Sequence, residues 1–368
     1  MILLSSLLRR VLYPAMSSAG VFAHRLRPGE VSVLTYHGLL PEPSSGARSF
    51  IDGALVSPQQ FRRQLRFLKS RYTLITPEEF RKWLQEDGSL PLRAVLLTCD
   101  DGLLNVLTEM VPILRDEGAR CLFFVTGASL VDGPEYLWYE ELYRMLEDAP
   151  PETMIGLRKG FVRKDSLSKK EIADSRADLI QGLSALNSED RKAMIAELRM
   201  AWKLPPHWQP YDPADERAER RYRLLNPSEL HQLVAQGMTV GAHSMSHPVL
   251  ARTSSEVAER EIRECRLKLE AHLQQEIWAF AYPFGNEGSA GEREMRMTQA
   301  AGYSCAFLNH GGGRESRSSP RFGLPRAHVT GQMGIAELEA HLSGFHGRLQ
   351  GRFRGALPAG TEGISSCV

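Results

Sequence analysis

Two adjacent carboxylates follow a run of residues that is typical of a buried strand. Ala94–Thr98 is continuously apolar and of strand length, and Asp100, Asp101 and Gly102 come directly after it. Active sites of parallel α/β proteins lie at the carboxyl ends of strands. Two neighbouring carboxylates at such a place need a cation or a shared proton, so the pair predicts a catalytic site. Alternatively, the two residues cap and begin a helix.

A pair of histidines follows a second short strand. His243 and His247 lie just beyond Thr239–Ala242, four residues apart. Two imidazoles at this spacing on one face of a helical turn can share a metal, although a single histidine is more often structural. Together with one aspartate they provide two nitrogens, one oxygen and an open position for water, which is the ligand set of a catalytic zinc site.

A third strand ends in an aromatic turn. In Phe280-Ala281-Tyr282-Pro283-Phe284-Gly285, Tyr282 ends the strand Ile277–Tyr282, and Pro283, Phe284 and Gly285 follow it. We interpret them as substrate-binding residues, a wall for a sugar ring with a backbone N–H that joins an oxyanion site. The alternative is ordinary termination of a strand by proline and glycine.

Taken together, these segments resemble the polysaccharide deacetylases of carbohydrate esterase family 4. Thr98-Cys99-Asp100-Asp101-Gly102 is similar to the family's T-F-D-D-G, with Cys99 in place of Phe, and His243–Pro248 matches H-[ST]-x-x-H-P. The resemblance implies that Asp100 is the catalytic base and that Asp101, His243 and His247 bind a divalent metal, which we expect to be Zn²⁺. It also implies a distorted (β/α) barrel of about seven parallel strands.

The segment Thr35-Tyr36-His37-Gly38 and the aromatic turn look closer to the branch that acts on exopolysaccharide poly-N-acetylglucosamine. In this interpretation His37 faces the site as a substrate-binding residue; a buried structural histidine is the alternative.

The chain departs from the family pattern in its later motifs. The usual arginine of the third motif is missing, and the fourth motif, with its tryptophan and aspartate, is not recognisable. We expect Arg326 to compensate by pairing with and orienting Asp100, and His328 to act as the catalytic acid. Arg326 as a surface residue and His310 as the acid are the alternatives.

The elements that must position these residues alternate between strand and helix. Repeated βα units predict a parallel sheet or barrel with helices outside. The resemblance covers residues 31–130 and 224–330. Residues 132–223 have no convincing strand and are helical and charged, so we expect a large helical insertion in a catalytic domain of residues 31–350. Residues 351–368 predict a flexible tail. The strands that we expect are Val31–Tyr36, Thr73–Ile75, Ala94–Thr98, Cys121–Val125, Thr239–Ala242, Ile277–Tyr282, Tyr303–Leu308 and Leu324–Val329.

Residues 1–30 are apolar and basic, but Arg9, Arg10 and Pro14 interrupt them too early for a membrane span. We favour an interfacial segment with Arg9, Arg10, Arg25 and Arg27 near lipid headgroups, which predicts a cytoplasmic enzyme, peripheral at the inner membrane. The alternative is a signal peptide, cleaved near Ala23, and export.

Composition limits the partners. The formal net charge of +1 provides no global field for nucleic acid, so we expect none as partner. The five cysteines include no C-x-x-C pair and indicate buried thiols rather than a disulfide framework.

The expected function is therefore hydrolysis of the N-acetyl amide of an amino sugar in a polysaccharide or glycan intermediate. Three alternatives remain open: a deformylase or deacylase of a lipid-linked or small amide, a non-catalytic carbohydrate-binding relative, and a membrane-associated assembly factor.

Overall fold

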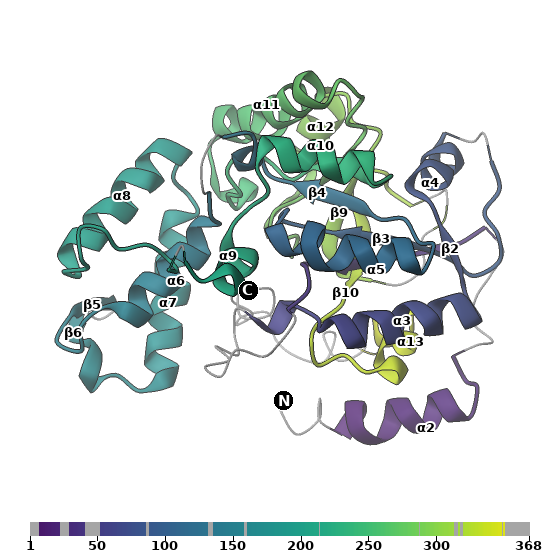
Figure 1. The fold of residues 1–368 in the computed structure, drawn as a ribbon, viewed down its shortest axis with the longest axis horizontal. Coiled ribbons are helices and arrows are strands. Elements are labelled where there is room, and N and C mark those ends of the chain that lie inside the picture. Colours follow the sequence, from purple (N-terminus) through teal and green to yellow (C-terminus); the bar gives the residue numbers. More distant parts are fainter. Residues whose placement is uncertain are drawn as a thin grey trace.

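Parallel strands form the centre of the molecule, and seven of them close into a barrel (Figure 1). The computed structural model describes residues 7–22, 29–40, 52–85, 88–131, 135–157, 160–212, 214–286, 288–312, 316, 319–347 and 349. Going around the barrel, the strands are β1 (Val31–Tyr36), β3 (Ala94–Cys99), β4 (Leu122–Val125), β7 (Thr239–Ala242), β8 (Ala279–Ala281), β9 (Cys305–Gly311) and β10 (Leu324–His328). Because β1 pairs with both β3 and β10, the ring is closed, which confirms the predicted (β/α) barrel.

An eighth strand, β2 (Thr73–Ile75), distorts the barrel. It pairs with the first half of β3, whereas β4 pairs with the second half, at Thr98 and Cys99. Since β1 occupies the other edge of β3 along its whole length, β2 and β4 share one edge. β2 and β4 therefore pair with successive parts of the same edge of β3 and diverge from each other there.

Alternation along the strands produces two layers of core. Val33, Leu96, Phe124 and Phe307 belong to the cluster that fills the barrel. Cys99 is fully buried in the outer cluster, among residues that pack under the helices, and burial raises the pKa of its thiol well above the usual value. The thiol is thus a packing group. The covering helices are α3 (Pro58–Arg71), α4 (Pro77–Leu84), α5 (Val111–Asp116), α10 (Pro227–Ala235), α11 (Ser255–Leu273), α12 (Glu292–Ala300) and α13 (Ile335–Leu342).

Local sequence explains several helix boundaries. Thr76 and Asn226 each form a capping box at the start of a helix, and Pro77 occupies the first turn of α4. A π-helical turn, Val106–Met110, precedes α5. Pro112 has no N–H to donate to the preceding turn, which accounts for the irregularity.

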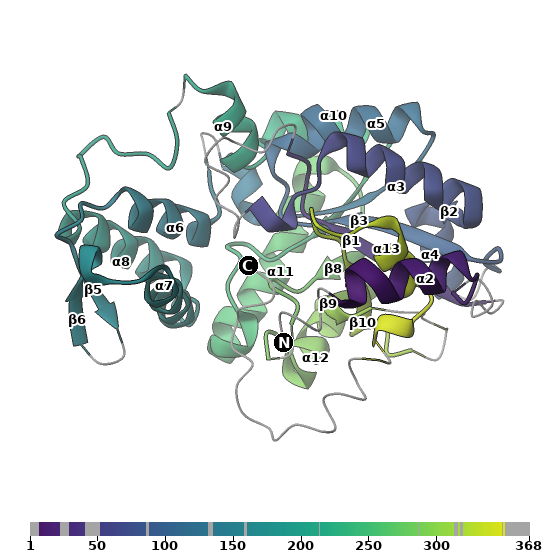
Figure 2. The same ribbon diagram turned by 90° about the horizontal axis from the view of Figure 1, so that it is seen from below.

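The insertion forms a separate lobe beside the barrel (Figures 1 and 2). It contains α6 (Trp138–Asp148), α7 (Lys169–Leu183), α8 (Ser188–Ala201) and α9 (Glu216–Tyr222). The prediction that this region lacks strands was wrong, because β5 (Met154–Leu157) and β6 (Gly160–Arg163) form an antiparallel hairpin. These strands are too short for the alternation of apolar and polar residues to be detected in the sequence. They are stabilised by contacts between residues paired across the hairpin.

The N-terminal segment packs on the barrel rather than extending from it. A π-helical turn, Leu8–Leu12, leads into α2 (Tyr13–Ser18), which lies beside α13 (Figure 2). Tyr13 and Phe22 are buried there, and Arg9 pairs with Glu337 at 2.8 Å, so this arginine already has a protein partner. Arg25, Arg27 and residues 351–368 lie outside the described residues. Among the described helices, none combines the length and apolar character that crossing a membrane requires.

Candidate active site and metal centre

The turn after β3 separates the two neighbouring aspartates. The Asp100 N–H continues the strand pairing by donating to the Tyr36 carbonyl at 2.9 Å. Asp101 and Gly102 then take left-handed conformations, with φ of 73° and 79°. A Cβ on Gly102 would lie 3.0 Å from Val125 Cγ1, so a side chain is disfavoured there on both counts. The next helical turn begins at Val106, so the alternative that the aspartates cap a helix is wrong.

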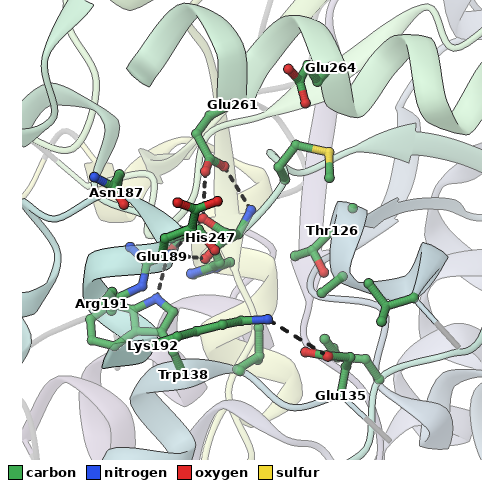
Figure 3. Close-up of a pocket in the computed structure, with 18 of the residues that line it drawn as sticks. Thr126, Glu135, Trp138, Asn187, Glu189, Arg191, Lys192, His247, Glu261 and Glu264 are labelled. Carbon is green, nitrogen blue, oxygen red and sulfur yellow. Dashed lines mark hydrogen bonds and ion pairs between the residues drawn. The ribbon is translucent and has the colours of Figure 1, made fainter. Parts of the chain in front are cut away.

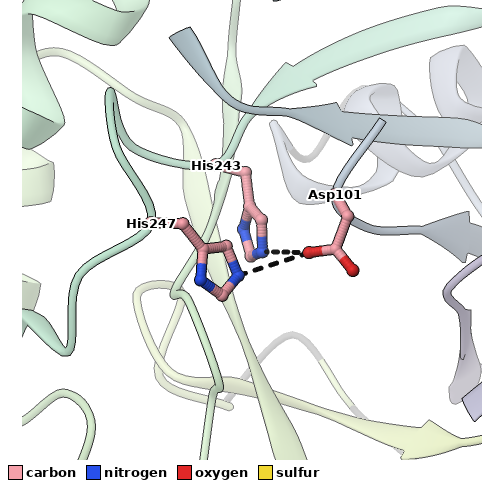
Figure 4. A group of neighbouring side chains, drawn as sticks. All are labelled: Asp101, His243 and His247. Atoms are coloured by element: carbon pink, nitrogen blue, oxygen red, sulfur yellow. Dashed lines mark ion pairs between the residues drawn. The ribbon is translucent and has the colours of Figure 1, made fainter. Parts of the chain in front are cut away.

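Asp101, His243 and His247 converge on one point (Figure 4). Asp101 Oδ1 lies 3.5 Å from His243 Nε2 and 3.2 Å from His247 Nε2, and all three side chains are at most 5% exposed. Ligands at about 2.0–2.1 Å around a tetrahedral metal lie roughly 3.3–3.4 Å apart, so these separations fit a shared cation. Two imidazole nitrogens aimed at one carboxylate oxygen form a suitable donor set for a divalent ion.

The histidine pair does not lie on a helical turn. Residues 243–247 form a loop without regular structure, in which Ser244 and His247 have φ of 63° and 54°. The four-residue spacing predicted the convergence of the rings but the wrong backbone.

The charges of the cluster support a metal. Burial alone would raise the pKa of Asp101, but hydrogen bonds from both histidines outweigh it and hold this pKa well below the usual value. Burial lowers the pKa of His247, although Asp101 opposes this effect. The lowered pKa keeps the imidazole ring neutral, as metal ligation requires. His243 Nδ1 is hydrogen-bonded to the Ala281 carbonyl at 2.8 Å, which orients Nε2 towards Asp101.

Asp100 is engaged by Arg326 in the predicted pair. Arg326 Nη1 and Nη2 donate to the two carboxylate oxygens at 2.7 and 2.5 Å, and the arginine is fully buried. Its Nε donates to the Leu308 carbonyl at 3.0 Å. Arg326 is therefore no surface residue. Burial would raise the pKa of Asp100, but the charges of Arg326 and His243 outweigh it, so this pKa lies below its usual value.

His37 and His328 lie beside this pair. They follow or end the neighbouring strands β1 and β10, and their ring centroids are 4.7 Å apart. Among the described residues, neither His37 Nδ1 nor His328 Nε2 has a hydrogen-bond partner, although both atoms are buried. Burial, with the neighbouring His37, lowers the pKa of His328 to about 3. His310, the alternative acid, lies near the end of β9.

The predicted aromatic wall is only partly formed. Tyr282 is fully buried in the outer core, where its hydroxyl donates to the Phe322 carbonyl at 3.0 Å, so its ring does not line the site. Gly285 also differs from prediction, because its N–H donates to the Pro283 carbonyl at 2.7 Å rather than being free for an oxyanion. Phe284, after the buried Pro283, does reach the centre, with its ring 4.9 Å from that of His247.

The insertion contributes residues that sequence reasoning did not assign. Tyr139 of α6 packs against His247 and Phe284. The centroid of its ring lies 5.2 Å from that of His247 and 5.5 Å from that of Phe284. Burial raises the pKa of its hydroxyl well above the usual value, and the charge of Asp101 adds to this. Its neighbour Trp138 donates from Nε1 to the His247 carbonyl at 2.8 Å. The aromatic richness of residues 136–146 was the only sequence signal.

The profile of the polysaccharide deacetylase family matches residues 209–305, which contain both histidine ligands. Over this segment the chain is similar to the polysaccharide deacetylase family. The barrel places Asp101, outside the matched residues, beside both histidines.

The individual proteins that this chain resembles are distant from it in sequence. YxkH of Bacillus subtilis (strain 168), assigned to the polysaccharide deacetylases, is 27% identical over 105 residues, 28% of this chain and 34% of YxkH. The match thus spans about a third of that relative's length.

Solved structures share the fold. The deacetylase PplD of Streptococcus pyogenes, in complex with acetate, aligns with a TM-score of 0.54 at 18% identity, over 86% of this chain and 99% of PplD. IcaB of Ammonifex degensii aligns with a TM-score of 0.51 at 18% identity, over 85% of this chain and 96% of IcaB.

Metal binding should separate the roles of the two aspartates. We expect Asp101→Ala to lose bound metal, because it removes the only carboxylate of the described ligand cluster. Asp100→Asn should retain metal, since Asp100 faces Arg326. The check is the metal-to-protein ratio after loading with Zn²⁺, with His231→Ala on α10 as a control. Full metal content in Asp101→Ala would contradict this assignment.

The Asp100–Arg326 pair should also determine stability. Arg326→Met leaves a buried carboxylate unpaired, which typically costs about 3–5 kcal/mol in the free energy of unfolding. Without Arg326, burial raises the pKa of Asp100 in the folded state, so stability is lost as pH rises from the unfolded value of about 3.9 through the raised folded value. Urea unfolding should therefore show a larger deficit at pH 7 than at pH 4.5.

The control for this experiment is Arg266→Met, which removes an arginine paired with Glu270 and stacked over Tyr303. Its deficit should not show the same increase between the two pH values. A pH-independent deficit in Arg326→Met would contradict the predicted dependence of Asp100 ionisation on Arg326.

Proposed function

We propose that this chain hydrolyses the N-acetyl amide of an amino sugar in a polysaccharide or glycan intermediate, releasing acetate. The observation that carries the proposal is the adjacency of two buried carboxylates with different partners. Asp101 faces two imidazoles, and Asp100 faces an arginine. Similarity to the polysaccharide deacetylase family favours amide hydrolysis over the other chemistries that such a cluster supports.

Asp101, His243 and His247 would hold the divalent metal, which we propose to be Zn²⁺. When bound, such an ion acts as a Lewis acid towards a carbonyl oxygen and lowers the pKa of water towards about 7. The ligand set of two histidines and one carboxylate is typical of catalytic rather than structural zinc sites.

Asp100 is proposed as the base that takes the proton of the attacking water. A base must be ionised before the reaction, and Arg326 favours ionisation by holding the pKa of Asp100 below its usual value. The bidentate contact also fixes the plane of the carboxylate. Arg326 would therefore act as a positioning residue for Asp100.

His328 is proposed to give a proton to the leaving amine, with His37 beside it as a substrate contact. With a pKa of about 3, His328 is neutral at pH 7, so it cannot hold the proton before the reaction begins. The proton must reach it during the cycle, and Asp100, once protonated, is the proposed source. Expulsion of the amine as an anion would otherwise be prohibitively slow.

The proposed substrate is a neutral N-acetylated glycan of the poly-N-acetylglucosamine type. The net charge of +1 offers no field to attract an anionic polymer. PplD was solved in complex with acetate, which is the product proposed for this chain. A second candidate, deacylation or deformylation of a lipid-linked or small amide, is supported by the insertion, because Tyr139 lies at the metal site.

Acetate release from short N-acetylglucosamine oligomers tests the proposed reaction. We expect acetate from the Zn²⁺-loaded protein, loss of it with a chelator, recovery on adding Zn²⁺, and none from His243→Ala. Asp100→Asn, which keeps the metal ligands, should lose turnover by about 10²–10⁴-fold. No acetate from the metal-loaded wild type would contradict the N-acetyl substrate and direct the search to formamido or lipid-linked amides.

We further propose that the N-terminal segment contacts the inner-membrane surface from the cytoplasm. Leu7 and Val11 are each 56% exposed, next to the exposed Arg10, which suits an interfacial surface. Leu7→Ser with Val11→Ser should reduce cosedimentation with anionic vesicles while leaving hydrolysis of a soluble oligomer unchanged. Substitution is preferable to truncation, because truncation would uncover α13. Equal partition of both forms would contradict the proposal.

A further inference from the structure

The loop that carries the His247 ligand has no regular secondary structure. It runs from Ser244 to His247, and both of these residues adopt left-handed conformations. Each costs about 1–2 kcal/mol for a residue other than glycine. The surroundings must therefore stabilise the loop in the conformation that points His247 at Asp101.

Side chains from elsewhere satisfy the backbone of the loop. At Ser246, the N–H and the hydroxyl donate to the Glu261 carboxylate at 2.8 and 2.6 Å. The Ser246 carbonyl and hydroxyl accept from Arg191 Nη2 at 2.8 and 2.7 Å. Figure 3 shows Arg191 and Glu261 meeting at this loop. Ser246 is thus held between a cation from the insertion and an anion from α11.

The residue at the end of the loop is held in the same way. The His247 N–H donates to Ser244 Oγ at 3.0 Å, and its carbonyl accepts from Trp138 Nε1 at 2.8 Å. Arg191 lies over the Trp138 ring, 5.0 Å from its centroid, so the two residues from the insertion also support each other. The backbone polar groups of His247 are both satisfied, one of them by the insertion.

Arg191 is buried to an extent that a surface contact would not require. It is 2% exposed, and burial lowers its pKa to about 10, against the opposing charge of Glu261. It remains charged at pH 7. Burying a guanidinium is unfavourable unless its N–H groups form hydrogen bonds. Arg191 donates two hydrogen bonds to Ser246 and one to the Leu186 carbonyl, the latter at 3.2 Å.

The two histidine ligands differ in how their rings are oriented. His243 is fixed by its Nδ1 contact with the Ala281 carbonyl. Within the part of the chain that the structure describes, the buried Nδ1 of His247 has no hydrogen-bond partner. Its ring packs instead against Phe284 and Tyr139, which also contact each other. The orientation of His247 therefore depends on the insertion as well as on Phe284 of the barrel, whereas that of His243 depends on the barrel alone.

We propose that the insertion is a structural part of the metal centre, in which Arg191 and Trp138 are positioning residues that fix His247 for metal ligation. The inference rests on the proposed metal site. It differs from a lid or a surface for glycan binding, because the contacts are with the backbone of the ligand loop. They also lie along one wall of a cavity of about 650 Å³ between the insertion and the barrel.

Zn²⁺ affinity, measured by competition with a chromophoric chelator, tests the proposal directly. Loss of a group that supports a metal ligand typically weakens affinity by about 10–100-fold, and we expect this in both Arg191→Met and Trp138→Phe. Arg191→Lys should recover only part of the loss, because an ammonium cannot reproduce the planar fork. The visible absorption of the Co²⁺-substituted protein should change in the same variants as His247 ligation weakens.

Arg199→Met is the matched control. Arg199 also lies on α8, pairs with Glu141 and stacks over Trp208, but no described contact joins it to the loop. Its Zn²⁺ affinity and Co²⁺ spectrum should equal those of the wild type. If Arg191→Met does not fold, Trp138→Phe decides, since it keeps an aromatic side chain at this position and removes the indole N–H that the His247 carbonyl accepts from.

Wild-type Zn²⁺ affinity and Co²⁺ spectrum in a folded Arg191→Met or Trp138→Phe would overturn the inference while leaving the proposed function intact. A wild type that binds no Zn²⁺ would instead overturn the metal-dependent function itself.

Discussion

The structure depends on a buried arginine inside the barrel. Arg326 packs against the rings of Phe124 and Phe307, with its Cζ 5.4 and 5.8 Å from their centroids, and its charge is tolerable there only with a matched anion. Asp100 supplies that anion. The Thr98 hydroxyl accepts a further hydrogen bond from Arg326 Nη1, and the Leu308 carbonyl accepts one from Nε. One side chain from β10 thereby contacts β3, β4 and β9, and the carboxylate that completes the barrel interior is also the proposed base.

This pairing determines how two adjacent aspartates divide their work. Both oxygens of Asp100 are used by Arg326, so the carboxylate cannot turn towards the histidines without leaving a buried charge unpaired. The left-handed conformation of Asp101 directs the next carboxylate away from that pair. A proposed base and a proposed ligand can therefore be neighbours in sequence without competing for the same partner.

Much of this arrangement could be predicted from sequence, because the residues concerned are local to strand ends. The strands were placed by apolar runs, and the Asp100–Asp101 and His243–His247 segments follow from the rule that parallel strands present their carboxyl ends together. Arg326 was found by noting which family arginine was missing. The wrong predictions concern residues whose side-chain direction is set by the local backbone conformation. Tyr282 faces the outer core and Phe284 the site, a difference set by a turn in which Phe284 has φ of 62°.

The role of the insertion was beyond sequence reasoning, because it rests on contacts between residues far apart in the chain. Trp138 and His247 are separated by 109 positions, and nothing in the local pattern of either predicts their hydrogen bond. The topology explains why they meet. The insertion leaves after β4 and returns before β7, which is the strand next to β4 and the one that leads into the ligand loop.

Its returning end is attached to the other half of the centre. The Leu225 N–H donates to the Gly102 carbonyl at 2.8 Å, directly after Asp101, and Leu224 forms a bridge with Leu103. The insertion is thus bonded to the turn that carries Asp101 and to the loop that carries His247, both of which are proposed ligands. Long insertions usually cost a barrel little, and the contacts of this one with both segments account for its packing against the site.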